Sequence, residues 1–146
     1  MINFFSTITG PRLAVRSNVV VLASTFHKYV TINVTDLATS VTDNCDHSVG
    51  VGSMNISMVT SDEPDNSTGD DNTSSDILIA ANCNSVQLRA ERSGNGNGRV
   101  YTITLKITDA SNNVSTATFK ITVPHSQNGA PAVDDGPHFT VVSNCP

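Results

Sequence analysis

An alternation of apolar and polar residues at a spacing of two most restricts the fold of this chain. The stretch 101–107 carries an apolar residue at every second position, and the stretch 117–123 repeats the pattern after the turn-forming sequence 109–113. Successive side chains of a strand point to opposite faces of a sheet, so both stretches predict strands with one buried face. No stretch keeps a helical period of 3.6 residues over three turns, and the chain is therefore expected to be all-β.

Shorter stretches of the same kind occur on both sides of these two. Strands are expected within 13–22, 28–34, 37–41, 53–60, 77–79, 85–92 and 139–142. Many short strands with turns about every 8–12 residues are typical of a β-sandwich. The pattern places Met54, Ile56 and Met58 on one buried face, and it places Arg89 and Glu91 on an outer face. We expect the sandwich to span residues 13–127, between an N-terminal extension at 1–12 and a C-terminal extension at 128–146.

The composition favours an extracellular module and excludes several other classes of protein. Only 14% of the residues are charged, tryptophan is absent, and the net charge is −5. The negative charge argues against nucleic acid or an anionic membrane surface as a partner. No apolar run reaches the roughly 20 residues that a membrane-spanning helix needs. The sequence therefore predicts a secreted or cell-surface protein.

An acidic stretch at 61–76 is the strongest signal for a binding site. It contains six of the thirteen acidic residues and no base. Carboxylates this close repel one another unless a positive charge lies among them, and mixed oxygen donors of this kind are preferred by Ca²⁺. The predicted calcium ligands are Asp62, Glu63, Asp70, Asn72, Asp76 and, from the next strand, Glu91.

Each part of this calcium site has a plainer alternative. The acidic stretch would otherwise be a solvated loop. Glu91 would otherwise form surface ion pairs with Arg89 or Arg92.

The three cysteines predict one disulfide and no zinc site. Cys45, Cys83 and Cys145 show no C-x-x-C spacing. Cys45–Cys83 is the expected disulfide, because both residues lie in similar Asn-Cys turns that flank the acidic stretch. Cys145 is then left for a covalent contact with another chain. Three unlinked thiols are the alternative.

No combination of residues predicts catalysis. The histidines His27, His47, His125 and His138 are dispersed, and none accompanies a serine or cysteine motif of a nucleophile. The glycine-rich stretch 94–98 leads into a strand, so it predicts a hairpin turn and not a phosphate site. We therefore expect a protein that is not an enzyme.

Several segments together resemble bacterial secreted immunoglobulin-like modules of the HYR or PKD kind. They cover roughly residues 27–127 and comprise 27–30, 61–64, 69–76, 85–92, 98–101 and 101–113. Relatives often carry Trp-Pro-Pro-Asn where this chain has Ala-Ser-Thr-Phe at 23–26, and a glycine where it has Asp71. The resemblance implies an immunoglobulin-like β-sandwich with a long acidic inter-strand loop. It also implies a role in adhesion or scaffolding.

The sequence thus predicts a calcium-stabilised structural or adhesion module. Expected partners are neighbouring domains of a larger secreted protein or further copies of the chain. Apolar residues near both ends, such as Phe4, Phe5 and Phe139, would either fold back or add a strand to another copy. The alternative is a carbohydrate-binding accessory module of an extracellular hydrolase, with glycans as ligands. That alternative requires exposed aromatic side chains.

Overall fold

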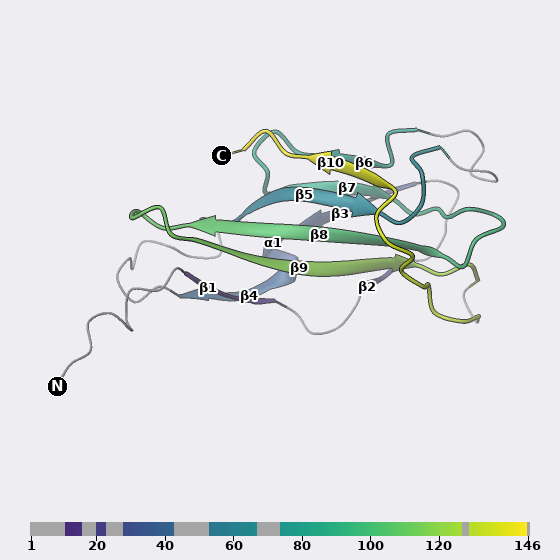
Figure 1. Cartoon of the computed structure of the whole chain (residues 1–146), viewed down its shortest axis with the longest axis horizontal. Coiled ribbons are helices and arrows are strands. Elements are labelled where there is room, and N and C mark those ends of the chain that lie inside the picture. The colour runs from purple at the N-terminus through teal and green to yellow at the C-terminus, as the bar shows by residue number, and fades with distance from the viewer. Residues whose placement is uncertain are drawn as a thin grey trace.

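Strands make up almost all of the regular structure in the part of the chain that the structure describes (Figure 1). The computed structural model describes residues 11–15, 20–22, 28–42, 53–66, 74–126 and 129–145. The elements in these ranges are β1 (Arg12–Val15), β2 (Val20–Val21), β3 (Tyr29–Asn33), α1 (Val34–Leu37), β4 (Ala38–Thr42), β5 (Asn55–Ser61), β6 (Ile77–Ile79), β7 (Ser85–Arg89), β8 (Arg99–Thr108), β9 (Val114–Val123) and β10 (Phe139–Val142). The expectation of an all-β chain is confirmed.

Two sheets enclose one hydrophobic core. The larger sheet has the strand order β10-β5-β8-β9-β2, and the smaller one has the order β3-β7-β6. A separate two-stranded ladder joins β1 to β4, and β1 also lies against β9. Neighbouring strands are antiparallel except β2 and β9, which are parallel. Buried side chains of both sheets form a single cluster, as a sandwich requires.

The hairpin of β8 and β9 is the longest pairing among the described strands. It runs from Arg99↔Val123 to Thr108↔Val114, and its alternate residues Ile103, Leu105 and Ile107 are buried. Burying one such aliphatic side chain stabilises the fold by about 1.5–3 kcal/mol. Asp109 closes the turn, because its Oδ1 accepts hydrogen bonds from the amides of Ser111 and Asn113 at 2.9 and 2.8 Å.

The alternation in β5 is interrupted, and this corrects one prediction. Ile56 and Val59 are buried, whereas Met58 is 37% exposed. The register against β8 shifts between Ile56 and Met58. An extra residue at such a bulge moves every later side chain to the opposite face. Met58 was therefore wrongly placed on the buried face, and Val59 takes that position.

A short helix connects β3 to β4 and was not predicted. Asp36 Oδ2 accepts hydrogen bonds from the backbone nitrogen and Nδ2 of Asn33, at 3.1 and 3.0 Å. Val34 and Leu37 point into the core. A helix of four residues shows no period in the sequence, which explains why the alternation gave no sign of it.

The C-terminal segment belongs to the larger sheet. β10 pairs with β5 in antiparallel register from Phe139↔Ser61 to Val142↔Met58, so the strand expected at 139–142 is present. Before it, the amide of His138 donates to the carbonyl oxygen of Ser61 at 2.8 Å. The segment therefore folds back onto its own chain. Residues 1–10 lie outside the described part of the chain.

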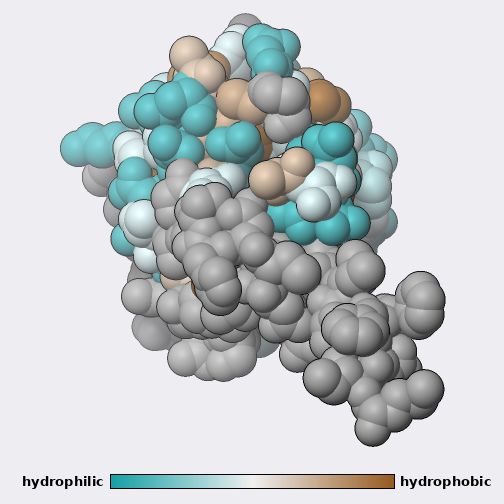
Figure 2. Space-filling view, turned by 90° about the vertical axis from the view of Figure 1, so that its left-hand side faces the viewer, coloured by the Kyte–Doolittle hydropathy of each residue, from teal (hydrophilic) through white to brown (hydrophobic). Residues whose placement is uncertain are grey.

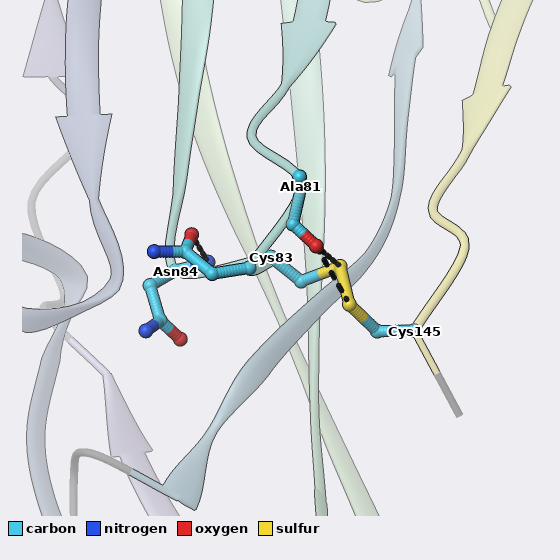
Figure 3. The surroundings of a disulfide bond; sticks show 5 residues. Ala81, Cys83, Asn84 and Cys145 are labelled. Atoms are coloured by element: carbon cyan, nitrogen blue, oxygen red, sulfur yellow. Dashed lines mark hydrogen bonds between the residues drawn. A yellow bond between two sulfur atoms is a disulfide. The ribbon is translucent and has the colours of Figure 1, made fainter.

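The disulfide joins Cys83 to Cys145, with a Cα–Cα distance of 6.4 Å (Figure 3). The expected pairing of Cys45 with Cys83 is therefore wrong, as is the expectation that Cys145 is left for another chain. Cys83 lies in the turn between β6 and β7, and the pairing of β10 with β5 brings Cys145 to this turn. Cys45 lies outside the described residues. Among the described helices, none is long and apolar enough to cross a membrane.

Candidate functional site

Arg99 lies at the centre of a buried group of charged side chains. It is the first residue of β8. Alternate residues of a strand point to the same face, so Arg99 points into the molecule with Tyr101 and Ile103. Its exposed fraction is 0%. A guanidinium remains charged at any pH that a folded protein tolerates, so its burial requires nearby carboxylates or other acceptors.

Three nitrogens of Arg99 find such acceptors. Nε lies 3.1 Å from Glu63 Oε2, and Nη1 lies 2.5 Å from Asp76 Oδ2. Nη1 also donates to Tyr101 Oη at 3.0 Å, and Nη2 donates to the carbonyl oxygen of Pro64 at 3.1 Å. Glu63, Pro64 and Asp76 all belong to the acidic stretch. Arg99 therefore neutralises part of that stretch and fixes both of its ends to β8.

Arg89, at the end of β7, is the second cation of this group. Its Nε lies 3.2 Å from Asp76 Oδ1 and 3.8 Å from Glu91 Oε1. Its Nη2 donates to Tyr29 Oη at 2.7 Å and to the carbonyl oxygen of Ser74 at 2.9 Å. Its guanidinium also covers the Tyr29 ring, at 4.2 Å from the ring centre.

Asp76 consequently connects the two sheets. Arg89 belongs to the smaller sheet and Arg99 to the larger one, and Asp76 accepts from both with different oxygens. Tyr101 adds a second link, because its hydroxyl donates to the carbonyl oxygen of Arg89 at 2.8 Å. We call Glu63, Asp76, Arg89, Glu91, Arg99 and Tyr101 the arginine cluster.

Asp65 holds the two ends of the acidic stretch together. Its Oδ2 accepts from the amide of Ser75 at 2.9 Å, and its Oδ1 accepts from the amide of Asp76 at 2.8 Å. Ser75 has a φ of 62°, and its carbonyl oxygen accepts from Tyr29 Oη at 2.7 Å. Successive amides around a left-handed residue form a small anion-binding concavity, which Asp65 fills. Residues 67–73, between these ends, lie outside the described part of the chain.

Asp62 is buried beside the arginine cluster but binds other groups. Its Oδ1 accepts from the amide of Val100 at 2.7 Å, and its Oδ2 accepts from the amide of Asp135 at 3.3 Å. Burial raises the pKa of Asp62, and the two amides partly oppose the rise. Asp62 thus holds the C-terminal segment against the start of β8.

Glu63 also contacts the turn before β8. Its Oε2 accepts from the amide of Ser93 at 2.7 Å in addition to its contact with Arg99. Its Oε1 is buried and has no hydrogen-bond partner among the described residues. This oxygen lies 2.9 Å from the position that a Cβ at Gly96 would occupy.

Burial changes the acidity of two members of the arginine cluster. It raises the pKa of Asp76 to about 7, with Arg99 opposing the rise and the neighbouring Glu91 adding to it. It also raises the pKa of Tyr101, so its phenol stays a hydrogen-bond donor at neutral pH.

The structure brings together only part of the predicted calcium site. Glu63, Asp76 and Glu91 meet in the arginine cluster, Asp62 binds separate amides, and Asp70 and Asn72 lie outside the described residues. Within the described ranges, no group of three or more His, Cys, Asp or Glu side chains is arranged to hold a metal. Calcium binding therefore stays a prediction.

The placement of Glu91 on an outer face was wrong. Glu91 is only 1% exposed. β7 ends at Arg89, and the amide of Glu91 bonds back to the carbonyl oxygen of Arg89 at 2.9 Å, so the strand alternation stops there. The surface pairing with Arg92 is not formed, because Arg92 Nε and Nη2 donate to the carbonyl oxygen of His125.

Sequence reasoning missed the cationic half of this group. Arg99 and Tyr101 continue the series of alternate positions that holds the apolar residues of 101–107. This spacing could have indicated a buried arginine. The contacts of Arg89 with Tyr29 and of Asp65 with Ser75 depend on the pairing of β3 with β7 and on loop geometry, respectively. No local pattern in the sequence indicates either of them.

A groove lies between the edge strands β6 and β10. Its volume is about 370 Å³, and it is lined by residues 77–81 and 141–144, which include no titratable side chain. The exposed apolar residues Leu78 and Val142 belong to this lining. Figure 2 views the molecule from the end at the left of Figure 1, and hydrophobic residues gather at the top of that face among hydrophilic ones.

The chain was compared with protein-family models, with curated proteins and with solved structures, and none of the three comparisons gave a match.

Proposed function

We propose that this chain is a non-catalytic, calcium-stabilised extracellular module of the immunoglobulin-like type. Its role is structural or adhesive, and it works beside neighbouring domains or further copies of itself.

One observation carries the structural role. Asp76, with an exposed fraction of 0%, is bound by Arg89 of the smaller sheet and by Arg99 of the larger sheet. A buried charge pair of this kind fixes the relative position of the elements that carry it, because separating them leaves a charge unpaired in the interior. The two described ends of the acidic stretch are thereby held on the sandwich.

The same contacts argue against catalysis. Acid–base chemistry needs a titratable side chain within reach of a substrate. Glu63, Asp76 and Glu91 are buried, and their charges face Arg89 and Arg99. The groove between β6 and β10 is lined by aliphatic and small polar residues.

The disulfide supports an extracellular location. Disulfides persist in oxidising compartments and are rare in the cytosol. Cys83–Cys145 links the turn between β6 and β7 to the end of β10, and so connects the smaller sheet to the larger one. The disulfide and the arginine cluster therefore link the same two sheets.

The charge balance supports calcium. Among the described residues near Arg99, the carboxylates of Asp62, Glu63, Asp76 and Glu91 are buried, and only two guanidiniums, those of Arg89 and Arg99, lie among them. The group therefore holds two more carboxyl groups than guanidiniums. A hard cation with oxygen ligands would stabilise this arrangement.

The carbohydrate-binding alternative has less support. Of the four aromatic residues in the described ranges, Tyr101 and Phe119 are buried, and Tyr29 and Phe139 are half-buried. The guanidinium of Arg89 covers the Tyr29 ring. This part of the chain therefore offers no exposed aromatic ring on which a sugar could stack.

Thermal melting and polysaccharide binding test the proposal together. Melting is followed in chelator, in CaCl₂ and in NaCl of equal ionic strength, and retention is measured on cellulose, chitin and xylan. We expect Ca²⁺ alone to raise the melting temperature, because a ligand of the folded state stabilises it by mass action. We expect no retention. Equal melting in all three solutions would contradict the calcium assignment, and saturable retention would contradict the structural role.

A further inference from the structure

We propose that the groove between β6 and β10 binds the N-terminal segment, residues 1–9, of a second copy of this chain as an added strand. The inference rests on the proposed function, because it identifies the place at which further copies of the chain would join. Each chain carries one such segment and one such groove. Copies would therefore join head to tail, with the segment of one in the groove of the next.

Both walls of the groove are edge strands with one side free. Among the described strands, β10 pairs only with β5, and β6 pairs only with β7. β6 and β10 belong to different sheets but line the same groove, and they lie side by side at the upper edge of Figure 1. An edge strand presents backbone N–H and C=O groups to its free side, and an added strand satisfies them.

The walls of the groove are also apolar and unprotected. Edge strands are commonly guarded by charged side chains or proline, and the lining at 77–81 and 141–144 contains neither. Ile79 and Val141 pack against the hydrophobic core but are only partly buried, and Val142 is 68% exposed. A further strand with apolar side chains would cover these residues and extend the core at this edge.

The N-terminal segment has the sequence that such a groove requires. Residues 1–9 contain no charged residue, no proline and no glycine. Ile2, Phe4 and Ile8 occupy alternate positions, so in an extended strand their side chains point to one face. Isoleucine and phenylalanine also favour the strand conformation. The Gly-Pro pair at 10–11 separates this segment from β1, because both residues interrupt a strand.

The segment must come from another copy, because its own groove is too distant. β1 follows the segment and lies against β9, and four strand spacings separate β9 from the free side of β10. Neighbouring strands lie about 4.8 Å apart, so this separation is roughly 19 Å. The extended chain from Ile8 to Arg12 spans about 14 Å at most. Figure 1 shows β1 and β10 at opposite edges of the sandwich, so a connection within one chain would leave Ile8 outside the groove.

Two complementary variants of the full-length chain test this inference. Phe4→Asp places a charge in the N-terminal segment and leaves the groove unchanged. Val142→Lys places a charge at the groove and leaves the segment unchanged. Val114→Lys is the matched control, because Val114 is 53% exposed on β9 and does not line the groove. The mass in solution is measured by size-exclusion chromatography with light scattering, in CaCl₂ and over a range of protein concentrations.

We expect the unaltered chain and Val114→Lys to form assemblies whose mass rises with concentration. Phe4→Asp and Val142→Lys should each be monomeric alone. Their equimolar mixture should form a one-to-one dimer and nothing larger, because the intact segment of one variant enters the intact groove of the other.

Other results would overturn the inference. A segment that folds back onto its own chain would leave the unaltered chain monomeric at every concentration. Pairing of β10 with β10 of another copy would survive Phe4→Asp. A mixture of two folded variants that stays monomeric would also contradict the groove as the binding place. If Val142→Lys melts well below Val114→Lys, Leu78→Lys replaces it, because Leu78 lies on the other wall and is 41% exposed.

The same samples separate this inference from the proposed function. Assembly without any effect of Ca²⁺ on the melting temperature would overturn the calcium-stabilised module and keep the groove as the site of assembly. A monomer that Ca²⁺ stabilises would overturn the inference and keep the calcium-stabilised module.

Discussion

Replacing Arg99 with methionine should strongly destabilise the fold. Methionine keeps most of the length of the side chain but has no charge and no donor. In Arg99→Met, Glu63 Oε2 loses the Nε contact at 3.1 Å, and Asp76 Oδ2 loses the Nη1 contact at 2.5 Å. Both carboxylates are buried, and neither can reach bulk water in exchange.

The expected loss follows from the burial of this pair. Removing one partner of a buried ion pair costs about 3–5 kcal/mol, because the other charge stays in the interior without compensation. Arg99 has an exposed fraction of 0%, so solvent does not screen the interaction. Asp76 keeps its contact with Arg89, which places the expected value near the lower end of this range. A loss of this size lowers the melting temperature by roughly 10 °C for a chain of this length.

Urea denaturation is the assay of choice, because guanidinium chloride would screen the charges under study. Arg92→Met is the matched control. Arg92 is half-buried, and among the described residues its side chain donates to the carbonyl oxygen of His125, so we expect a loss of about 1 kcal/mol or less. Equal losses for the two variants would refute the assignment of Arg99 as the neutralising cation of the acidic stretch.

Two further results are expected. Burial raises the pKa of Asp76 from 3.8 to about 7, so the folded state holds a proton that the unfolded state has released. The resulting stabilisation is complete below the unfolded pKa, and the free energy of unfolding should fall as pH rises from about 4 to about 7 in metal-free solution, with a smaller fall in Asp76→Asn. Cys145→Ser opens a disulfide between residues 62 positions apart and should lower the free energy of unfolding by about 4 kcal/mol. Non-reducing peptide mapping should recover Cys83 linked to Cys145 of the same chain, and a Cys45–Cys83 peptide would contradict the structure.

The strands could be predicted from the sequence because alternation is local. The alternating apolar positions of β8 all lie within one stretch of ten residues, and the same is true of β9. Both strands occur where they were expected. Met58 was misplaced for a reason that the sequence does not show. The bulge between Ile56 and Met58 depends on how β5 pairs with β8, which is a long-range contact.

The disulfide and the cations of the site could not be predicted for the same reason. Cys83 and Cys145 become neighbours only after β10 has paired with β5. The carboxylates of the acidic stretch were evident, and so was their need for a positive charge. Its source, Arg99, lies 23 residues after Asp76 in the chain and meets it only through the packing of the two sheets. The local sign of this contact was the position of Arg99 on the same face of β8 as Tyr101 and Ile103.

A double-mutant cycle between Arg99 and Asp76 tests most directly whether buried charge pairs fix the acidic stretch to the sandwich. The free energy of unfolding is measured in urea for Arg99→Met, for Asp76→Leu, for the double variant and for the unaltered chain. If the two residues form the pair described, the double variant should be more stable than the sum of the single losses implies, by about 2 kcal/mol. Losses that add to within about 0.5 kcal/mol would contradict the account, because residues that do not interact behave in that way.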